Sequence, residues 1–197
     1  MIPIDPSNPV TPIDPVPSSD SLSTAVEQSD EGEWASGSGT TCYLGLGGNL
    51  GNPMQLFDAV VEDISRWPQA NMVCESPRYQ SQPLNAPGPQ YTNSVIELVW
   101  SGSPDDLLQA CLNLEAMHGR TRTTKNAPRT VDLDLLLFGQ AIIQTTDLTV
   151  PHPRMHLRRF VLEPLQQLNP GLDIPIHGPV RTLLQATLNQ PLWPAGQ

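Results

Sequence analysis

The sequence predicts an α+β protein with a ferredoxin-like βαββαβ sandwich, in which an antiparallel sheet carries helices on one face. Two segments repeat apolar residues at three- and four-residue steps or carry helix start signals, which is typical of helices packed on a core. Other segments alternate polar and apolar residues or form short apolar runs, as strands do. In chain order the elements read strand, helix, strand, strand, helix, strand. A fold of this kind decides no function by itself.

The first predicted strand covers residues 42–46 and ends at a pair of glycines. Asn52 then suits the N-cap of a helix, and Pro53 suits its first position. The helix is predicted over residues 53–67, and residues 71–80 are expected to be extended. Its apolar face consists of Leu56, Val60, Ile64 and Trp67.

The second half of the motif begins with an alternating segment at 93–100, which predicts a strand. The second helix opens at residues 103–104. Its first turn contains Asp105 and Asp106, where the helix dipole favours acidic side chains, and Gly119 ends it.

The C-terminal part is expected to contain one long strand and two further helices. Residues 130–138 alternate early and predict the strand, and residues 141–145 are expected to return beside it as a hairpin partner. The helices are predicted over 158–168 and 180–188.

The chain divides into an extension, 1–40, and one folded domain, 41–197. Proline occupies every third position from residue 3 to residue 15, a spacing that favours polyproline II. A stretch rich in Ser, Asp, Glu and Gly follows, with too little apolar content to offset the entropy of ordering it. Residues 1–40 are therefore predicted to be disordered, as a spacer or, alternatively, as a docking site for a proline-binding module.

The charge of the chain is unevenly distributed. Seven of the 20 acidic residues lie in the extension, which has no Lys or Arg, so residues 41–197 carry 13 acidic and 10 basic residues. Such a concentrated basic region favours a small polyanionic ligand over nucleic acid, which would more often need a broad basic face. The region contains Arg120, Arg122, Lys125, Arg129, Arg154, Arg158 and Arg159.

The expected cellular location and the expected state of the cysteines follow from features that the sequence lacks. No apolar stretch approaches the roughly 18 to 20 residues of a membrane helix, and the first 20 residues have the features of neither a secretory signal nor a transit peptide. A cytoplasmic protein is expected. The cysteines at 42, 74 and 111 have no metal-ligand spacing and are expected to be buried thiols.

The most informative pattern is the pair Asp132 and Asp134 in the predicted strand 130–138. Residues two apart share a face of a strand, so the two carboxylates point the same way, roughly 6.5 to 7 Å apart. Carboxylates together with phosphate oxygens are what Mg²⁺ prefers, and two such ions could lie between this pair and a triphosphate. Taken alone, the pair could equally be an exposed polar face.

Arginines next to this pair decide between the two interpretations. Arg120, Arg122 and Arg129 stand just upstream, and guanidinium groups bind phosphate with two hydrogen bonds. Metal-binding acids beside phosphate-binding arginines are the parts that phosphoryl transfer needs. The intervening residues 119–128 are expected to form a loop that closes over a nucleotide.

Two further segments offer ligand-binding groups. The basic segment 150–160 contains His152 and Arg158, which are expected to contact phosphate or ribose rather than zinc. The Pro- and Gly-rich segment 76–93 ends with Tyr91 and Asn93, and an aromatic ring with an amide suits a flat heterocycle, although a tyrosine there could simply pack.

These motifs together resemble the hydroxymethyldihydropterin pyrophosphokinase family. The resemblance rests on Tyr-Leu-Gly-Leu-Gly-Gly-Asn-Leu over 43–50, on residues 79–93, on Pro-Arg-Thr-Val-Asp-Leu-Asp over 128–134, and on Pro-His-Pro-Arg-Met over 151–155. It covers about residues 41–190.

The resemblance implies two Mg²⁺ ions, ATP as co-substrate and transfer of pyrophosphate to a pterin alcohol in folate biosynthesis. It implies metal binding by Asp132 and Asp134. The groups that would hold ATP phosphates are Arg120, Arg122, Arg129, His152 and Arg158, and Glu115 would also contact ATP. The catalytic groups would be Arg120, Arg122, Arg129, Asp132 and Asp134. The groups that would hold the pterin are Ser81, Leu84, Tyr91, Asn93 and Phe160.

In the implied reaction, the pterin hydroxymethyl oxygen attacks the β-phosphorus of ATP and AMP leaves. Asn126 stands where the family often has a tryptophan, the surrounding loop is about one residue short, and Gln82 replaces a common proline. A monomer without nucleic-acid or membrane partners is expected. The alternatives are an inactive pyrophosphokinase-like regulator, another Mg²⁺-nucleotide transferase, and an RNA-binding module on the same fold.

Overall fold

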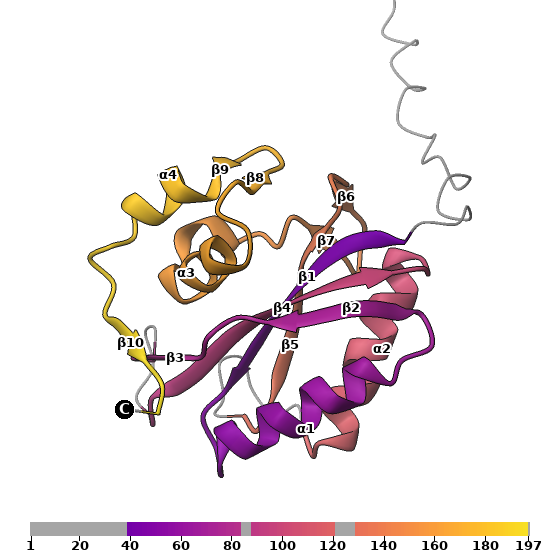
Figure 1. Cartoon of the computed structure of the whole chain (residues 1–197), viewed down its shortest axis with the longest axis horizontal. Helices are drawn as coiled ribbons and strands as arrows, with labels where there is room; N and C mark the ends of the chain where they lie inside the picture. The colour runs from indigo at the N-terminus through magenta and orange to yellow at the C-terminus, as the bar shows by residue number, and fades with distance from the viewer. Residues whose placement is uncertain (1–38, 84–87, 121–128, 197) are drawn as a thin grey trace, which may run out of the picture. The chain divides into compact units, whose positions relative to one another are not determined.

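A computed structural model describes residues 39–83, 88–120 and 129–196 of the 197-residue chain. A six-stranded antiparallel sheet forms its centre, with helices on both of its faces (Figure 1). Apart from its last two residues, the predicted extension 1–40 lies outside the described residues. The first strand begins at Thr40.

The sheet is built around strand β1 (Thr40–Gly48). It pairs with β4 (Tyr91–Trp100) on one side and with β5 (Asp132–Phe138) on the other, in both cases antiparallel. Two shorter strands, β2 (Ala70–Glu75) and β3 (Tyr79–Ser81), pair in succession with the other edge of β4. Strand β10 (Leu192–Pro194) extends the sheet beyond β3.

Helices α1 (Pro53–Ser65) and α2 (Pro104–Met117) complete the predicted βαββαβ motif. The side chain of Asn52 accepts a hydrogen bond from the backbone N–H of Gln55, and Pro53 occupies the first helical position, as predicted. Ser103 and Asp106 form a capping box at the start of α2, in which each side chain bonds the other's backbone N–H. The α+β ferredoxin-like class is confirmed.

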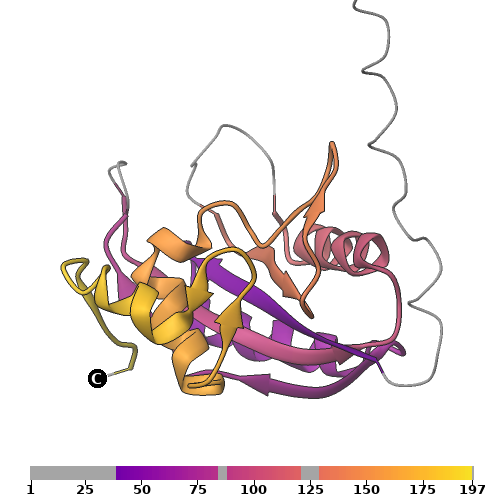
Figure 2. The same ribbon diagram turned by 90° about the horizontal axis from the view of Figure 1, so that it is seen from above.

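Apolar side chains of the central strands point to both faces of the sheet. Cys42, Leu44 and Leu46 face α1 and α2, which cover one face as predicted. Tyr43 and Leu136 belong to a second core with helices α3 (Arg159–Leu168) and α4 (Val180–Gln185), on the side opposite α1 (Figures 1 and 2). The second face is therefore also covered by helices, which requires apolar side chains on both sides of the strands.

The predicted hairpin between residues 130–138 and 141–145 is wrong. Strand β6 (Ile143–Gln144) pairs with β7 (Thr149–Val150) in a separate two-stranded sheet. The outer edge of β5 is used by the chain that follows β7, because the backbone N–H of His152 donates to the carbonyl of Leu136 at 3.0 Å. This places the segment around residue 152 beside the end of β5.

The C-terminal helices occur where they were predicted, but α4 ends at Gln185 instead of residue 188. A 3-10 turn, η1 (Met155–Leu157), leads into α3. Strands β8 (Asp173–Ile174) and β9 (Gly178–Pro179) form a small hairpin between α3 and α4.

Two of the three thiols are buried as expected. Burial raises the pKa of Cys42 to about 12, and it also raises the pKa of Cys111. Cys74 is exposed, which corrects the expectation: it lies on β2, at an edge of the described sheet, and its side chain faces solvent.

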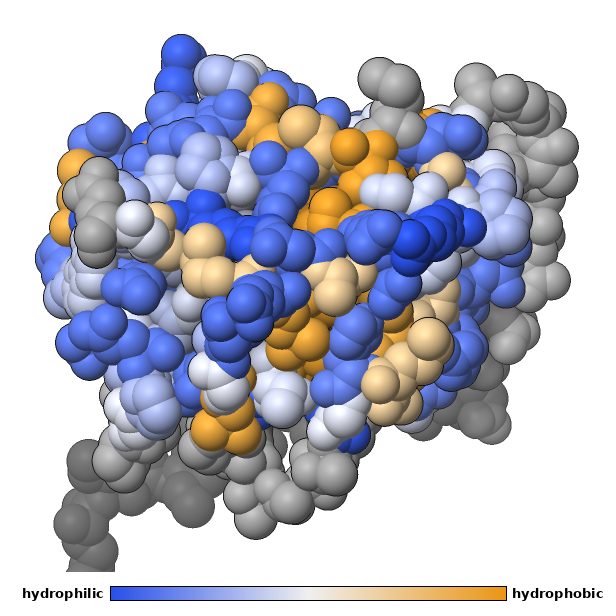
Figure 3. Space-filling view, turned by 60° about the horizontal axis from the view of Figure 1, so that its bottom comes forward, coloured by the Kyte–Doolittle hydropathy of each residue, from blue (hydrophilic) through white to orange (hydrophobic). Residues whose placement is uncertain are grey.

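The surface of the described residues contains both hydrophobic and hydrophilic areas. Figure 3 shows one face on which a band of hydrophobic residues is flanked by hydrophilic ones. Apolar atoms form a large part of the surface of any folded protein, so this band alone assigns no partner. In the described ranges no helix combines the length and apolarity needed to cross a bilayer.

Candidate active site

The candidate site lies on the face of the sheet that α3 covers, and it is organised by two glycines of β1. Gly47 stands opposite Asn93 of β4 and opposite Asp132 of β5, and Gly45 stands opposite Asp134. A Cβ atom at Gly47 would lie 3.9 Å from Oδ1 of Asn93 and 4.0 Å from Cβ of Asp132. Because Gly47 has no side chain, the space between the amide and the carboxylate stays open.

Two cavities adjoin the aspartates. The first has a volume of about 300 Å³, and Gly45 and Gly47 line it. Asp132 and Asp134 form one wall. The remaining walls include Ser81, Tyr91, Asn93, Arg129, Arg154, Arg158 and Phe160. The sequence-predicted aromatic pair and amide therefore line the same cavity as the predicted metal ligands.

The second cavity, of about 640 Å³, is lined by the same carboxylates. Helix α2 contributes Leu108, Leu112 and Glu115, and the chain after β6 contributes Leu148 and His152. Asp132 and Asp134 line both cavities. Among the described lining residues these two are the ones that the cavities share, so ligands in the two cavities would meet beside them.

Asp132 is held between two arginines. Its Oδ1 lies 2.7 Å from Nη1 of Arg120, and its Oδ2 lies 2.7 Å from Nη1 of Arg129. Burial and the neighbouring Asp134 raise the pKa of Asp132, although both arginines oppose this effect. The side chain of Asp134 is 40% exposed, and Nε2 of His152 lies 3.9 Å from its Oδ2.

Glu115 explains how Arg120 is held. Its buried carboxylate accepts a hydrogen bond from the backbone N–H of Leu133 at 2.7 Å and a second one from the Arg120 guanidinium. Burial raises the pKa of Glu115. The side chain therefore ties α2 to the start of β5 and places Arg120 beside Asp132.

His152 is arranged as a neutral hydrogen-bond donor. Its Nδ1 accepts from the backbone N–H of Arg154 at 3.2 Å, so in the neutral ring the proton is on Nε2, the atom nearest Asp134. Burial, followed by the charges of Arg158 and Arg154, lowers the pKa of His152 to about 4. Near neutral pH it can donate to a phosphate oxygen without carrying charge.

Asn93 presents a fixed acceptor to the first cavity. Its Nδ2 donates to Oγ of Ser81 at 3.0 Å and lies 3.4 Å and 3.5 Å from the carbonyls of Tyr91 and Tyr79. With acceptors around Nδ2, the amide orientation is determined, and Oδ1 lies on the side of Gly47. The site can thus accept a hydrogen bond from the edge of a planar ring.

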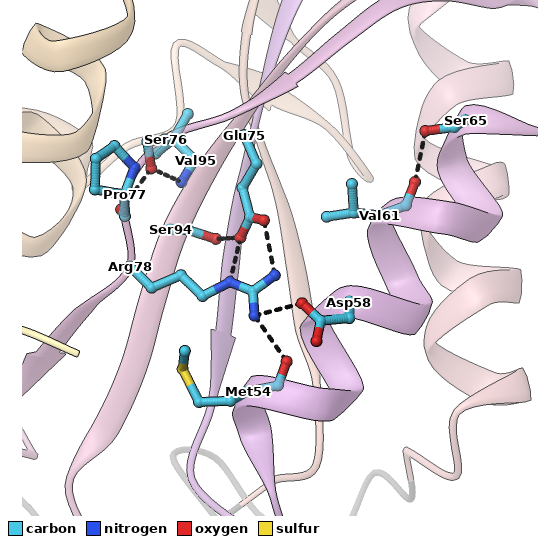
Figure 4. Close-up of polar contacts among 10 residues, drawn as sticks. All are labelled: Met54, Asp58, Val61, Ser65, Glu75, Ser76, Pro77, Arg78, Ser94 and Val95. Carbon is cyan, nitrogen blue, oxygen red and sulfur yellow. Dashed lines mark hydrogen bonds and ion pairs between the residues drawn. The ribbon is translucent and has the colours of Figure 1, made fainter. Parts of the chain in front are cut away.

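An ion-pair network around Arg78 lies next to the strands that carry Ser81 and Asn93. Arg78 donates two hydrogen bonds of 2.8 Å to Glu75 and contacts Asp58 and the Met54 carbonyl of α1, as Figure 4 shows. Glu75 also accepts from Ser94 at 2.7 Å. The network fixes the turn between β2 and β3, which delivers Ser81 to Asn93. Its members come from α1, β2, β4 and the turn before β3, so no single sequence pattern indicated it.

Some sequence-predicted residues have other roles or lie outside the described part. Leu84, Arg122 and Asn126 are outside the described residues. Arg159 bonds Glu163 and the backbone of residues 188–190, and it does not line either cavity.

The apolar wall of the second cavity was also missed, although a signal for it existed. Leu108, Leu112 and Glu115 are spaced four and three residues apart, so they share one face of α2. The basic segment also contained Arg154, which lines the first cavity.

The donor set fits a magnesium ion that is shared with a ligand. Within the described ranges, no group of three or more His, Cys, Asp or Glu side chains could hold a metal by itself. Mg²⁺ is usually held by one or two carboxylates, with substrate phosphates and water completing its shell. Asp132 and Asp134, between two cavities and beside arginines, match that requirement.

Comparison with protein families gives one match over residues 43–170, to the model described as 7,8-dihydro-6-hydroxymethylpterin-pyrophosphokinase (HPPK). A relative from Pseudomonas aeruginosa, named 2-amino-4-hydroxy-6-hydroxymethyldihydropteridine pyrophosphokinase, is 41% identical over 134 residues, which cover 68% of this chain and 83% of the relative. A relative of the same name from Haemophilus influenzae is 38% identical over 136 residues, covering 68% and 85% of the two chains.

Solved structures with a similar fold include an HPPK-DHPS in complex with substrates, with a TM-score of 0.60 at 11% identity. The likeness covers 76% of this chain and 43% of that one. A Plasmodium falciparum HPPK-DHPS triple mutant gives a TM-score of 0.61 at 10% identity, covering 78% and 44%. At such identities the likeness concerns the fold alone, and this chain spans less than half of those chains.

Proposed function

This chain belongs to the 7,8-dihydro-6-hydroxymethylpterin-pyrophosphokinase family, and we infer from this that it transfers pyrophosphate from ATP to 6-hydroxymethyl-7,8-dihydropterin in folate biosynthesis. The products are AMP and the pterin diphosphate. The observation that carries the proposal is that Asp132 and Asp134 line two cavities at once. A transfer between two substrates needs such a meeting point.

The pterin is assigned to the first cavity. Tyr91 and Phe160 both line it, and aromatic rings stack on a flat heterocycle. Oδ1 of Asn93 accepts a hydrogen bond from the donor edge of the ring, while Ser81 keeps the amide in that orientation. The hydroxymethyl group then extends toward the two aspartates.

ATP is assigned to the second cavity. Leu108, Leu112 and Leu148 offer an apolar surface for the adenine ring, and His152 and Arg120 lie nearer the aspartates. With the adenine ring on the leucines, the phosphates reach Asp132 and Asp134, which line both cavities. Arg129 and Arg158 then approach the phosphates from the side of the first cavity.

Asp132 and Asp134 would hold Mg²⁺, two ions in the family pattern, and the metal would supply charge neutralisation on the phosphate oxygens. Arg120 and Arg129, released from Asp132, can then bind phosphate with their guanidinium forks.

In the reaction, the pterin hydroxymethyl oxygen forms a bond to the β-phosphorus, and the bond from that phosphorus to the α,β-bridging oxygen breaks. AMP leaves with that oxygen, and the hydroxyl proton passes to solvent or to a phosphate oxygen. Positioning and electrostatic stabilisation by the arginines and His152 supply the catalysis, and no side-chain base is required.

Three further parts of the proposal concern the whole chain. We assign the reaction to a monomer in the cytoplasm, and we assign no catalytic role to the extension 1–40. The intact set of Asp132, Arg120 and Arg129 favours an active enzyme over an inactive regulator, because a regulator would not need to retain it.

A product analysis tests the proposal. The full chain is incubated with ATP, Mg²⁺ and 6-hydroxymethyl-7,8-dihydropterin, and nucleotides are separated by chromatography. AMP that forms only when the pterin is present is the expected result. ADP would identify an ordinary kinase, and the absence of any product would favour the inactive regulator.

A further inference from the structure

Gln190 lies beyond the part of the chain that the family match covers, yet it contacts the backbone on both sides of Arg158. Its Nε2 donates to the carbonyl of Leu157 at 2.8 Å. Its Oε1 accepts from the backbone N–H of Arg159 at 2.9 Å. The Gln190 carboxamide therefore donates one hydrogen bond to, and accepts one from, the backbone on either side of Arg158.

Arg158 needs such support because of where it stands. It joins η1 to α3 with extended backbone angles, φ −121° and ψ 109°, and no side chain of its own caps the helix. The N–H of Arg159 is one of the first N–H groups of α3, which lack partners inside a helix. Gln190 supplies the missing acceptor.

The Arg158 side chain is not fixed by a counter-ion in the described part of the chain. Its guanidinium lies 5.5 Å from the centre of the Phe160 ring, in the wall of the first cavity. Among the described residues the guanidinium forms no ion pair with a carboxylate, although the charges of Asp134 and Asp132 act on it from farther away. The position of its backbone therefore decides where its charge lies.

Gln190 is itself held in place by Arg159. The Arg159 Nη1 donates to the carbonyls of Gln190 at 3.0 Å and of Leu188 at 3.2 Å. Two residues farther on, β10 pairs with β3, with Leu192 opposite Ser81. The same short segment thus joins both sides of the first cavity.

We propose that Gln190 is a positioning residue for Arg158, acting through the backbone on either side of it and making no contact with the substrates. The proposal rests on the proposed function, in which Arg158 binds phosphate. It assigns a role in the reaction to a residue outside the matched family region.

A double-mutant cycle tests it. The variants are Gln190→Leu, Arg158→Ala and the double variant, with Gln185→Leu as a matched control on the exposed end of α4. We expect Gln190→Leu to lower kcat/KM for ATP about tenfold in the parent, as a misplaced binding group would, and less than twofold in the Arg158→Ala background. Gln185→Leu should leave kcat/KM unchanged.

Two results would overturn the proposal: no effect of Gln190→Leu in the parent, or an equal effect in both backgrounds, which would indicate a general loss of packing. Melting temperatures are measured for the parent and all four variants. If Gln190→Leu does not fold, the cycle is repeated with Gln190→Glu, which keeps the acceptor for Arg159 and loses the donor to Leu157.

Failure of the proposed function would be recognised separately, because the parent would then form no AMP. In that case the same proteins are titrated with α,β-methylene ATP, whose α,β bond cannot be cleaved by this transfer. Binding about tenfold weaker for Gln190→Leu only when Arg158 is present would still support the inference. Equal binding would reject it.

Discussion

Nη1 of Arg120 lies 2.7 Å from Oδ1 of Asp132, so the site pairs a predicted phosphate-binding group with a predicted metal ligand. The same arginine also bonds the buried Glu115. Binding of a metal-nucleotide complex has to replace the pairing with Asp132, while the pairing with Glu115 can remain. Glu115 would then keep Arg120 close to the nucleotide phosphates both before and after the nucleotide binds.

Replacement of Asp132 by Asn should separate activity from stability. Burial and Asp134 raise the pKa of Asp132, which favours a neutral side chain, but an amide also loses the charge that pairs with Arg120 and Arg129. These effects oppose each other, so the melting temperature should change little. Turnover should fall at least about 1,000-fold because the metal loses a charged ligand. Activity and thermal unfolding are measured together. Asp173→Asn, exposed on β8, is the control, and residual activity within about tenfold of the parent would refute the metal assignment.

His152 should make the protein sensitive to acid. Its folded-state pKa of about 4 lies below the ordinary value of 6.5, so the unfolded chain binds this proton more readily between those pH values. The free energy of unfolding should therefore fall as the pH drops from 6.5 to 4, by up to about 3 kcal/mol from this residue.

The variant His152→Gln keeps a neutral donor and removes that titration. Denaturant unfolding at pH 6.5 and pH 4 should show a smaller loss of stability for the variant than for the parent. An identical loss in both proteins would mean that His152 is not held neutral. At pH 7 the variant should retain more activity than His152→Ala, because a neutral donor remains beside Asp134.

Sequence patterns predicted the motif well because its signals are local. The cap at Asn52, the helix start at 103–104 with its two acids, and the alternation around Asp132 each involve neighbours a few residues apart. The pairing of β6 was predicted wrongly because the choice of partner depends on His152 occupying the edge of β5, which is a long-range contact.

The candidate site divides in the same way. Asp132 and Asp134 were predicted from a two-residue spacing, and the structure brings them together with Asn93 across Gly47. The support from Arg78 and Gln190 could not be predicted, since each joins segments that are adjacent only after folding. The groups predicted to contact ligands therefore left motifs in the sequence, whereas Arg78 and Gln190, which support them, did not.

Asn93 should control binding of the pterin and leave binding of ATP unchanged. In Asn93→Leu the acceptor Oδ1 is lost, so the affinity for the pterin should fall about 10- to 100-fold, as for a lost buried hydrogen bond. Ser81→Ala removes one of the acceptors of the Asn93 amide and should have a smaller effect in the same direction. Calorimetric titration with each substrate is the measurement, and equal losses for both substrates would contradict the assignment.

The adjacent residues Gly47 and Gly48 of β1 offer the most local test, because replacement by alanine should affect them differently. At Gly47 a Cβ atom would make only ordinary contacts, 3.9 Å and 4.0 Å from its neighbours, so Gly47→Ala should fold normally. At Gly48 a Cβ atom would lie 2.4 Å from the backbone carbonyl oxygen of Thr130, and that backbone has to move. Gly48→Ala should therefore cost about 1 to 3 kcal/mol of stability.

In contrast to Gly48→Ala, the Gly47→Ala variant should lose activity without losing stability. The added methyl of Gly47→Ala occupies the floor between Asn93 and Asp132, so it should lower kcat/KM for the pterin while the melting temperature stays within about 2 °C of the parent. Chemical denaturation and steady-state kinetics are run on both variants. A stable Gly47→Ala enzyme with parental kcat/KM would show that the pterin does not lie over Gly47, and the first cavity would then need a different ligand.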